Sequence, residues 1–238
     1  MLEPRLLARL EEKKAALDAL RPLPQAAVRR LQEQLTVEWI YNSNAIEGNT
    51  LTLRQTKLIL ETGLTIGGKS LREHFEVLNH KEAIDYVESL VKGLAPVTPF
   101  DARQIHGLVL TRIDDEEAGQ YRRVQVYIAG ADHRPPEAWQ VPQLMADWGD
   151  WLNGPARDLH PVVRAALAHH RLVVVHPFPS TALRTGVDGN GRTARLVMNL
   201  LLMRDGYPPT IIEKAHRRQY ERVLTATVLL HADVPPGL

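Results

Sequence analysis

The residues best suited to catalysis are gathered in one stretch, from His176 to Arg195. Its second part, residues 188–195, reads Asp-Gly-Asn-Gly-Arg-Thr-Ala-Arg and opens an apolar segment that closes at Gly206. The two glycines allow backbone angles that other residues avoid, so successive N–H groups can converge on one anion. Arg192 lies three residues before Arg195, on a neighbouring face of the same helical turn. These groups at a helix N-terminus predict a site for a polyphosphate.

A carboxylate and a histidine flank this predicted phosphate site. Asp188 supplies a hard oxygen ligand, which suits Mg2+ held by one carboxylate, phosphate oxygens and water. Pro177 ends the preceding helix at His176, and a neutral imidazole there can take the proton of an attacking hydroxyl. Either motif alone is usually a turn or a helix stop. Their combination with two arginines at helical spacing indicates a site that does chemistry.

Helical periodicity and helix start and stop signals dominate the rest of the chain. Residues 120–128 instead alternate polar and apolar side chains, and the turn-forming residues 129–136 follow, which predicts a short β-hairpin. No linker divides the chain, so we expect one mainly α-helical domain with an N-terminal helical extension at residues 1–35. The helices are predicted at residues 2–20, 25–46, 52–62, 71–92, 101–112, 141–152 and 161–175, with another leading from the 188–195 motif to Gly206.

The composition excludes several classes of protein. The chain has 238 residues with 29 Lys plus Arg against 28 Asp plus Glu, and its net charge of +1 does not suit coating nucleic acid or an anionic membrane. A hydrophobic content of 44% supports a sizeable core and excludes a wholly disordered chain. The absence of cysteine excludes disulfides, zinc-thiolate sites and a thiol nucleophile. With neither a signal peptide nor a membrane-spanning run in its sequence, the protein is expected to be cytoplasmic.

The pattern His-Pro-Phe at residues 176–178, followed by Asp-Gly-Asn-Gly-Arg-x-x-Arg at 188–195, resembles the signature of the Fic family. Residues 120–136 are similar to the flap of that family, and the whole resemblance covers residues 36–225. It implies an all-α Fic fold with a short β-hairpin flap. It also implies transfer of AMP from ATP, with Mg2+, to a Ser, Thr or Tyr hydroxyl of a target protein.

The same resemblance gives each functional group a role. His176 would be the base that activates the hydroxyl, and Asp188 would bind Mg2+. The Fic core would span residues 63–238, with its active loop at residues 176–195. The nucleotide would be held by Gly189, Asn190, Gly191, Arg192, Arg195 and Tyr220. The target segment would add as a strand to the flap at Ile128, Ala129, Gly130, Ala131 and Asp132.

A second informative segment lies at the end of the helix predicted at residues 25–46. Ser43 and Glu47 are four residues apart and share one helix face, and Glu47 gains nothing from the dipole at a helix C-terminus. Taken alone, Glu47 would be a solvated glutamate. The run from Ser43 to Gly48 resembles the Fic inhibitory motif, which marks residues 36–62 as an inhibitory region before the core. The resemblance implies that Glu47 pairs with Arg195 and blocks the γ-phosphate, and it allows the same carboxylate to serve in de-AMPylation.

Residues 179–187 depart from the family pattern. Nine residues stand between Phe178 and Asp188, where the family has one. If this segment bulges outward the site survives, since added loop length costs little entropy. If it enters the pocket, catalysis is lost while nucleotide binding persists. We favour the outward bulge. Three hydroxyl side chains in the segment either only form the loop, the simpler interpretation, or are modified by the protein itself: Ser180, Thr181 and Thr185.

Thr227 and four further histidines also bear on the site. Thr227 stands where relatives often carry Asn in the helix that contains Tyr220, which makes adenine contacts doubtful. Four other histidines lack cysteines or suitably spaced acidic ligands, so they are interpreted as structural or flap residues rather than metal ligands: His106, His133, His169 and His170.

Three functions stay open from the sequence. The leading hypothesis is an ATP- and Mg2+-dependent protein adenylyltransferase that Glu47 autoinhibits. One alternative is a nucleotide-binding regulatory protein that has lost transfer through residues 179–187. The other is a phosphate-binding domain recruited to a protein partner. The target protein and the nucleotide preference do not follow from the residues, a homodimer is allowed, and neither a membrane partner nor a nucleic-acid-binding module is expected in this chain.

Overall fold

The computed structural model describes residues 3–93, 95–127, 134–179 and 188–231, with 225–231 described by their backbone alone. Every regular element in these residues is helical, which confirms the mainly α-helical prediction. No described helix combines the length and the apolar character needed to cross a membrane. The α-helices are α1 (Pro4–Ala19), α2 (Gln25–Ile46), α3 (Leu53–Thr62), α4 (Leu71–Lys92), α5 (Pro99–Leu110), α6 (Val141–Asn153), α7 (Pro161–Val175), α8 (Asn190–Arg204) and α9 (Arg217–His231). Short 3₁₀ turns lie at η1 (Ala138–Gln140), η2 (Pro155–Asp158) and η3 (Lys214–His216).

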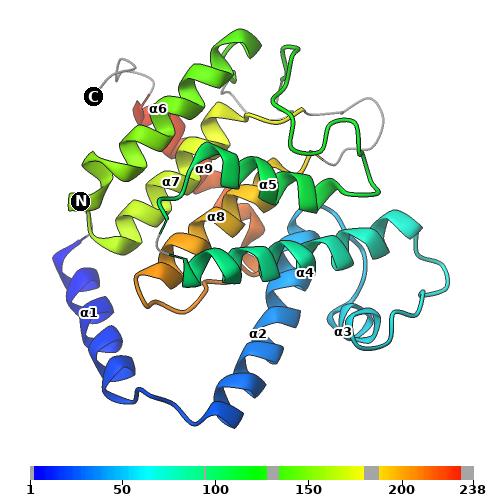
Figure 1. The fold of residues 1–238 in the computed structure, drawn as a ribbon, viewed down its shortest axis with the longest axis horizontal. Helices are drawn as coiled ribbons and strands as arrows, with labels where there is room; N and C mark the ends of the chain where they lie inside the picture. Colours follow the sequence, from blue (N-terminus) through cyan, green and yellow to red (C-terminus); the bar gives the residue numbers. More distant parts are fainter. Residues whose placement is uncertain (1–2, 94, 128–133, 180–187, 232–238) are drawn as a thin grey trace.

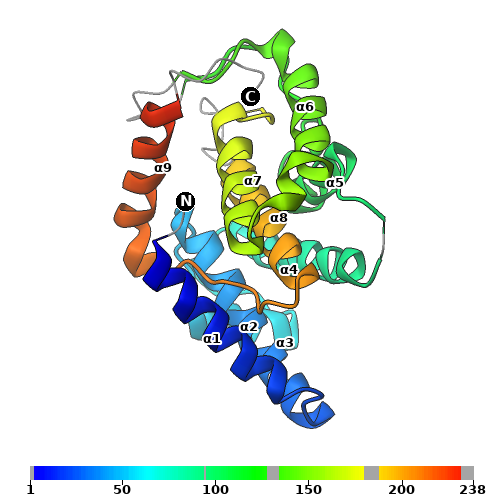
Figure 2. The same ribbon diagram turned by 90° about the vertical axis from the view of Figure 1, so that its left-hand side faces the viewer.

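Helix α8 is the axis of the fold, because its side chains are buried on all sides from Arg192 to Leu202. Figures 1 and 2 show it in the middle of the molecule, with α4, α5 and α7 packed around it. Leu196, Val197 and Leu200 are fully buried in one continuous core. Full burial of such a side chain contributes about 1.5–3 kcal/mol. The motif at the start of α8 therefore rests on a firmly packed helix.

The helix boundaries follow from the capping signals in the sequence. Thr52 and Gln55 form the predicted capping box at the start of α3, and Gly63 ends this helix with a φ of 69°. The Gln55 N–H donates to Thr52 Oγ1 at 3.2 Å, and the Thr52 N–H donates to Gln55 Oε1 at 2.9 Å. Helix α7 stops at Val175 because Pro177 follows and His176 takes a left-handed conformation. The predicted end of α7 is thereby confirmed.

Helices α1 and α2 precede the core as a splayed pair (Figure 1). None of the described residues of α1 is buried. A bond of 2.7 Å from the Arg21 guanidinium to the Gly206 carbonyl holds its C-terminal end. In α2, by contrast, Trp39 and Ile40 are buried, and the helix ends in a buried run from Ser43 to Ile46. The last turn of α2 thus lies inside the packing of α4 and α8.

The predicted β-hairpin at residues 120–136 is not formed in its described parts, 120–127 and 134–136. Pro135 and Pro136 have no N–H group to donate to a strand ladder. Side chains bind the returning arm instead: Gln125 Nε2 donates to the Pro135 carbonyl at 3.0 Å, and Arg122 donates to the Pro136 carbonyl. The two arms are therefore joined by side-chain hydrogen bonds where strand pairing was expected. The tip, residues 128–133, lies outside the described residues.

Candidate active site

His176 occupies the junction between α7 and the active loop. Its φ of 46° is left-handed, which costs a non-glycine residue about 1–2 kcal/mol. Arg122 stabilises this turn, because its Nε donates to the His176 carbonyl at 2.8 Å and its backbone N–H donates to the Pro177 carbonyl at 2.9 Å. Arg122 is itself buried, with 2% of its surface exposed. An ordered neighbour thus fixes the direction in which the imidazole points.

The imidazole of His176 faces the two polar residues of the phosphate motif. Its Nε2 lies 3.1 Å from Asp188 Oδ2 and 3.2 Å from Asn190 Nδ2. Asp188 Oδ1 accepts the backbone N–H of Asn190 at 2.9 Å, which closes the turn that opens α8. The structure therefore brings the predicted base and the predicted metal ligand together, although nine residues separate Phe178 from Asp188 in the sequence.

The start of α8 has the geometry expected of an anion site. Gly189 precedes the helix with a φ of 69°, a conformation that suits glycine. The first turn of an α-helix presents N–H groups that lack an intrahelical acceptor, and the helix dipole adds positive charge there. A Cβ atom on Gly191 would lie 2.4 Å from Glu47 Oε1. Only glycine fits at this position while Glu47 stays where it is.

The end of α2 occupies the guanidinium of Arg195. Its Nη2 donates to Glu47 Oε1 at 2.7 Å and to the Ser43 carbonyl at 2.9 Å, while Nε donates to Ser43 Oγ at 3.0 Å. The Arg195 side chain is 4% exposed, and that of Glu47 is 33% exposed. Burial lowers the pKa of Arg195, but the Glu47 charge and Tyr220 outweigh burial, so the pKa is raised. The Glu47–Arg195 pair implied by the resemblance is present.

Arg192 is buried beside this pair and keeps unused donors. Only 1% of its surface is exposed, and its Nε and Nη2 have no hydrogen-bond partner among the described residues. Burial lowers the pKa of Arg192, while Glu76, Glu47 and Asp188 oppose that shift. An unsatisfied buried donor costs about 1–3 kcal/mol. Anionic oxygens placed against the guanidinium would remove this penalty, which fits a phosphate-binding role.

Tyr220 of α9 completes the surroundings of Arg195. Its hydroxyl lies 2.9 Å from His169 Nε2, and its ring centre lies 6.0 Å from the Arg195 guanidinium carbon. Burial lowers the pKa of His169 to about 3, so the imidazole is neutral at pH 7. His169, which the sequence marked as structural, is therefore a hydrogen-bond partner of a predicted nucleotide-binding residue.

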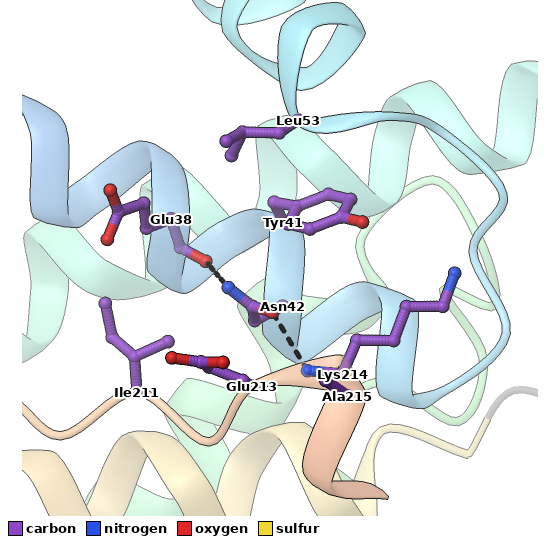
Figure 3. Close-up of a pocket in the computed structure, with 8 residues that line it drawn as sticks. All are labelled: Glu38, Tyr41, Asn42, Leu53, Ile211, Glu213, Lys214 and Ala215. Atoms are coloured by element: carbon purple, nitrogen blue, oxygen red, sulfur yellow. Dashed lines mark hydrogen bonds between the residues drawn. The ribbon is translucent and has the colours of Figure 1, made fainter.

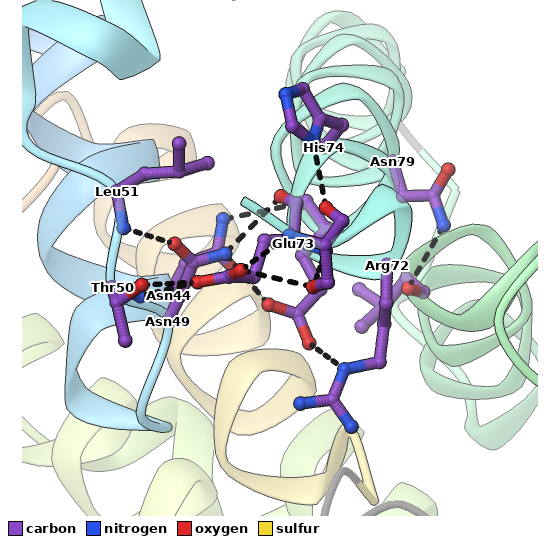
Figure 4. Close-up of polar contacts among 11 residues, drawn as sticks. Asn44, Asn49, Thr50, Leu51, Arg72, Glu73, His74 and Asn79 are labelled. Atoms are coloured by element: carbon purple, nitrogen blue, oxygen red, sulfur yellow. Dashed lines mark hydrogen bonds and ion pairs between the residues drawn. The ribbon is translucent and has the colours of Figure 1, made fainter. Parts of the chain in front are cut away.

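The segment that follows Glu47 is tied to the start of α4, as Figure 4 shows. Asn49 Nδ2 donates to Glu76 Oε2 at 2.7 Å and to the Glu73 carbonyl at 3.2 Å. Thr50 donates to Glu73 Oε1 from its backbone at 2.9 Å and from its hydroxyl at 2.6 Å. Burial raises the pKa of Glu73, but the hydrogen bonds from Thr50 and Ser70 outweigh it and lower the pKa to about 2. The sequence analysis missed this network, although the Ser70–Glu73 capping box is visible in the sequence.

His106 of α5 is a second residue that the sequence analysis underrated. Its ring is fully buried and stacks on Phe178, with centroids 3.9 Å apart and planes 7° apart. Nδ1 accepts the Gly119 N–H at 2.9 Å, and Nε2 lies 2.9 Å from the Asp188 carbonyl. Burial lowers the pKa of His106 to about 4. The ring is thus neutral at pH 7, and it contacts both Phe178 and Asp188, the residues on either side of segment 179–187.

Several predicted residues lie outside the described part of the chain. The target-binding flap residues Ile128 to Asp132 and His133 belong to this group, and so do the hydroxyl residues of segment 180–187. The side chain of Thr227 is also outside it. Their expected roles stay predictions.

A cavity of about 680 Å3 lies apart from these groups, beside α2. Figure 3 shows that Asn42 spans it, accepting the Lys214 N–H at 2.9 Å and donating to the Glu38 carbonyl at 2.9 Å. It contains none of the predicted site residues, so we do not assign the chemistry to it. Its lining is formed by Glu38, Tyr41, Asn42, Leu53, Ile211, Glu213, Lys214 and Ala215.

Comparison with known proteins agrees with this arrangement. A profile of the Fic/DOC family matches residues 96–202. The chain is 44% identical over 224 residues to the protein adenylyltransferase Fic of Drosophila willistoni, covering 94% of this chain and 43% of the relative. It is 43% identical over 221 residues to the protein of the same name from Culex quinquefasciatus, covering 92% of this chain and 42% of the relative. The chain thus spans less than half the length of these curated relatives.

Solved structures extend the likeness to the fold. A Fic domain containing signaling protein from Bacteroides thetaiotaomicron superposes with a TM-score of 0.84 at 31% identity, covering 96% of this chain and 83% of that one. Fic-1 from C. elegans, residues 134–508, superposes with a TM-score of 0.79 at 36% identity, covering 94% and 67%. The chain thus has a helical core in which a glycine-rich turn opens α8 and a histidine, His176, lies beside that turn. The chain belongs to the Fic family.

Proposed function

We propose that this chain is a protein adenylyltransferase that transfers AMP from ATP to a hydroxyl side chain of a target protein. The observation that carries the proposal is the contact of His176 Nε2 with Asp188 and Asn190 at the N-terminus of α8, at 3.1 and 3.2 Å. A base, a carboxylate and a helix N-terminus meet there around one point. The curated relatives named above bear the name of this activity.

The nucleotide is held mainly by charge and by backbone donors. The first turn of α8 takes phosphate oxygens, and Arg192 contributes the two donors that lack a partner among the described residues. No group of three His, Cys, Asp or Glu side chains in the described residues could hold a metal ion. A single carboxylate, Asp188, fits Mg2+, which keeps phosphate and water ligands. When bound, Mg2+ would neutralise phosphate charge.

The transfer step follows from the position of His176. The target hydroxyl oxygen attacks the α-phosphorus of ATP, and its proton passes to His176 Nε2. The bond from the α-phosphorus to the bridging oxygen breaks, and pyrophosphate leaves with the electron pair. AMP stays on the target oxygen as a phosphodiester. The chain contributes positioning and charge stabilisation, which are the main contributions that transfer at phosphorus requires.

Glu47 holds the enzyme inactive by occupying Arg195. Three donor contacts of this guanidinium are used by Ser43 and Glu47, so they are not available to the γ-phosphate. ATP then binds with its triphosphate turned away from in-line attack. Moving the reacting atoms by about 1 Å is enough to cost a large factor in rate.

Residues 120–136 are assigned to target binding. The support is the contact between the described arms of this segment and the catalytic turn: Arg122 donates to the His176 carbonyl at 2.8 Å and also to the Pro136 carbonyl. A target segment bound along these arms would lie beside the turn that carries His176. Cytoplasmic location and a homodimer stay predictions.

Labelled ATP tests the proposal. We expect Glu47→Gly to raise AMP incorporation at least tenfold over the native chain, because Arg195 becomes free to bind phosphate. The double variant Glu47→Gly/His176→Ala, with the same nucleotide site but no base, should fall back to background. ATP binding without incorporation in Glu47→Gly would refute transfer and favour a nucleotide-binding regulatory protein. Absence of any nucleotide binding would refute both.

A further inference from the structure

The chain on either side of segment 179–187 meets in space. The Phe178 N–H donates to Asn190 Oδ1 at 3.1 Å, and Asn190 Nδ2 donates to the Phe178 carbonyl at 3.2 Å. The chain therefore leaves the site at Phe178 and returns to it at Asp188. A longer connection gives two ends more conformations in which they are apart. Something other than the connection must then hold them together.

His106 contacts both ends from α5. Its ring lies flat on Phe178, 3.9 Å between centroids, and its Nε2 lies 2.9 Å from the carbonyl of Asp188. The Gly119 N–H donates to Nδ1, so the proton of the neutral ring is on Nε2. Nε2 thus donates to the Asp188 carbonyl. One side chain binds one end by stacking and the other by a hydrogen bond.

The backbone of Gly189 packs directly against the His106 ring. A Cβ atom on Gly189 would lie 3.0 Å from His106 Cδ2 and 3.1 Å from its Nε2, so the backbone at Gly189 approaches as closely as a glycine permits. His106 is fully buried in α5, which packs against α4 and α8. The ring is therefore a fixed surface from which the position of Asp188 and Gly189 is set.

Both ring nitrogens of the buried His106 make a hydrogen bond. A residue that only filled space would be apolar here, because burying an imidazole requires partners for both nitrogens. His106 Nδ1 accepts the Gly119 N–H, which fixes the ring, and Nε2 donates to the Asp188 carbonyl. The second bond contributes to the turn that carries the phosphate-binding residues.

We propose that His106 is a positioning residue that clamps Phe178 to Asp188 across residues 179–187, keeping His176 and the phosphate-binding turn in register. The clamp rests on the proposed function for its effect on rate, but its effect on the loop does not. It gives a physical reason why nine residues can be accommodated between the base and the phosphate site.

Two substitutions of similar chemistry separate the clamp from general packing. His106→Gln places an amide N–H at the level of Nε2 and can still donate to the Asp188 carbonyl, whereas His106→Asn reaches only the level of Nδ1. In the Glu47→Gly background, we expect His106→Asn to lower kcat for AMP transfer at least tenfold. His106→Gln, which keeps the bond to Asp188 but lacks the ring that stacks on Phe178, should lose activity by a clearly smaller factor. Equal losses in the two variants would overturn the clamp.

Amide hydrogen exchange gives a readout that does not depend on activity. Residues 188–193 should exchange at least tenfold faster in His106→Asn than in the native chain, with exchange in α4 unchanged and His106→Gln close to native. Unchanged exchange at 188–193 would overturn the clamp even if activity fell. If His106→Asn does not fold, His106→Phe, which keeps the stacking and the volume but loses both hydrogen bonds, takes its place with the same expectation.

Shortening the loop supplies the decisive comparison. Deleting residues 180–187 leaves one residue between Phe178 and Asp188, so the covalent chain itself holds the ends together. In this shortened chain, His106→Asn should accelerate exchange at residues 188–193 by threefold or less. The same acceleration in long and short chains would overturn the proposal. If Glu47→Gly transfers no AMP, the proposed function fails, while the exchange results still decide on the clamp.

Discussion

One buried guanidinium connects inhibition with catalysis. Arg195 gives its donors to Ser43 and Glu47, and it lies in the second turn of α8, the helix that should hold ATP. Leaving the buried Arg195 without its anion is costly, because removing one partner of a buried pair costs about 3–5 kcal/mol. In the proposed function, Glu47 and the γ-phosphate compete for the same guanidinium. Inhibition and nucleotide binding would then be one exchange of anions.

The stability of Glu47→Gly should reveal this exchange. Without nucleotide, the variant should lose about 1–2 kcal/mol of unfolding free energy, less than a fully buried pair because the Glu47 side chain is 33% exposed. Saturating ATP should raise the melting temperature of the variant more than that of the native chain. Glu61→Gly, at an exposed pair of α3, serves as control for the glycine itself. Equal ATP-induced shifts in native chain and variant would contradict competition.

The last turn of α2 is the element to which we assign the inhibition, and it is held in place by α4. Its buried run from Ser43 to Ile46 is followed by Asn49 and Thr50, which bind Glu73 and Glu76. The inhibitory carboxylate thus stands between two anchors, α8 through Arg195 and α4 through this network. Loosening the second anchor should weaken inhibition without touching any group that binds ATP.

Asn49→Ala tests the anchor on α4. Loss of its bonds to Glu76 Oε2 and the Glu73 carbonyl should raise AMP transfer by about tenfold or more, since a hydrogen bond to a charged group contributes about 1.5–3 kcal/mol and about 1.4 kcal/mol is a factor of ten. Asn42→Ala is the matched control, because Asn42 lies on α2 but bonds to Glu38 and Lys214 beside the cavity. Activation by both variants alike would contradict a role for the α4 anchor.

The sequence was informative wherever local rules decide the outcome. The capping box at Thr52, the stop at Pro177 and the turn at Gly189 were all predicted and are present. The predicted strand pairing is absent from the described arms, 120–127 and 134–136, because Pro135 and Pro136 have no N–H group to donate. His106 and Arg122 were missed as site residues, since their importance comes from contacts with residues 54 or more positions away. Only the folded chain brings such pairs together.

At the scale of the whole molecule, α8 joins the core to the chemistry. Its buried middle is the axis of the helical packing, and its first turn carries the phosphate-binding motif. Three groups meet at that end, Glu47 from the end of α2, His106 from α5 and His176 from the end of α7. Stability and function are therefore coupled at the N-terminus of one helix.

Acid should loosen this assembly through Glu73. Its pKa of about 2 lies below the usual 4.5, so the ionised form is stabilised in the folded state. That stabilisation is fully present above pH 4.5 and is lost as the pH falls toward 2. Urea unfolding at pH 6, 4 and 3 should show a steeper loss in the native chain than in Glu73→Gln. Parallel pH profiles would contradict this role.

The central claim is that His176 and the start of α8 act on the α-phosphate of ATP once Glu47 releases Arg195. A structure of Glu47→Gly with Mg2+ and a non-hydrolysable ATP analogue measures this directly. We predict that His176 Nε2 faces the α-phosphorus opposite the pyrophosphate group, with the Arg195 guanidinium on the γ-phosphate. A triphosphate that binds with its α-phosphorus out of reach of His176, or an Arg195 that stays on Ser43 alone, would contradict the account.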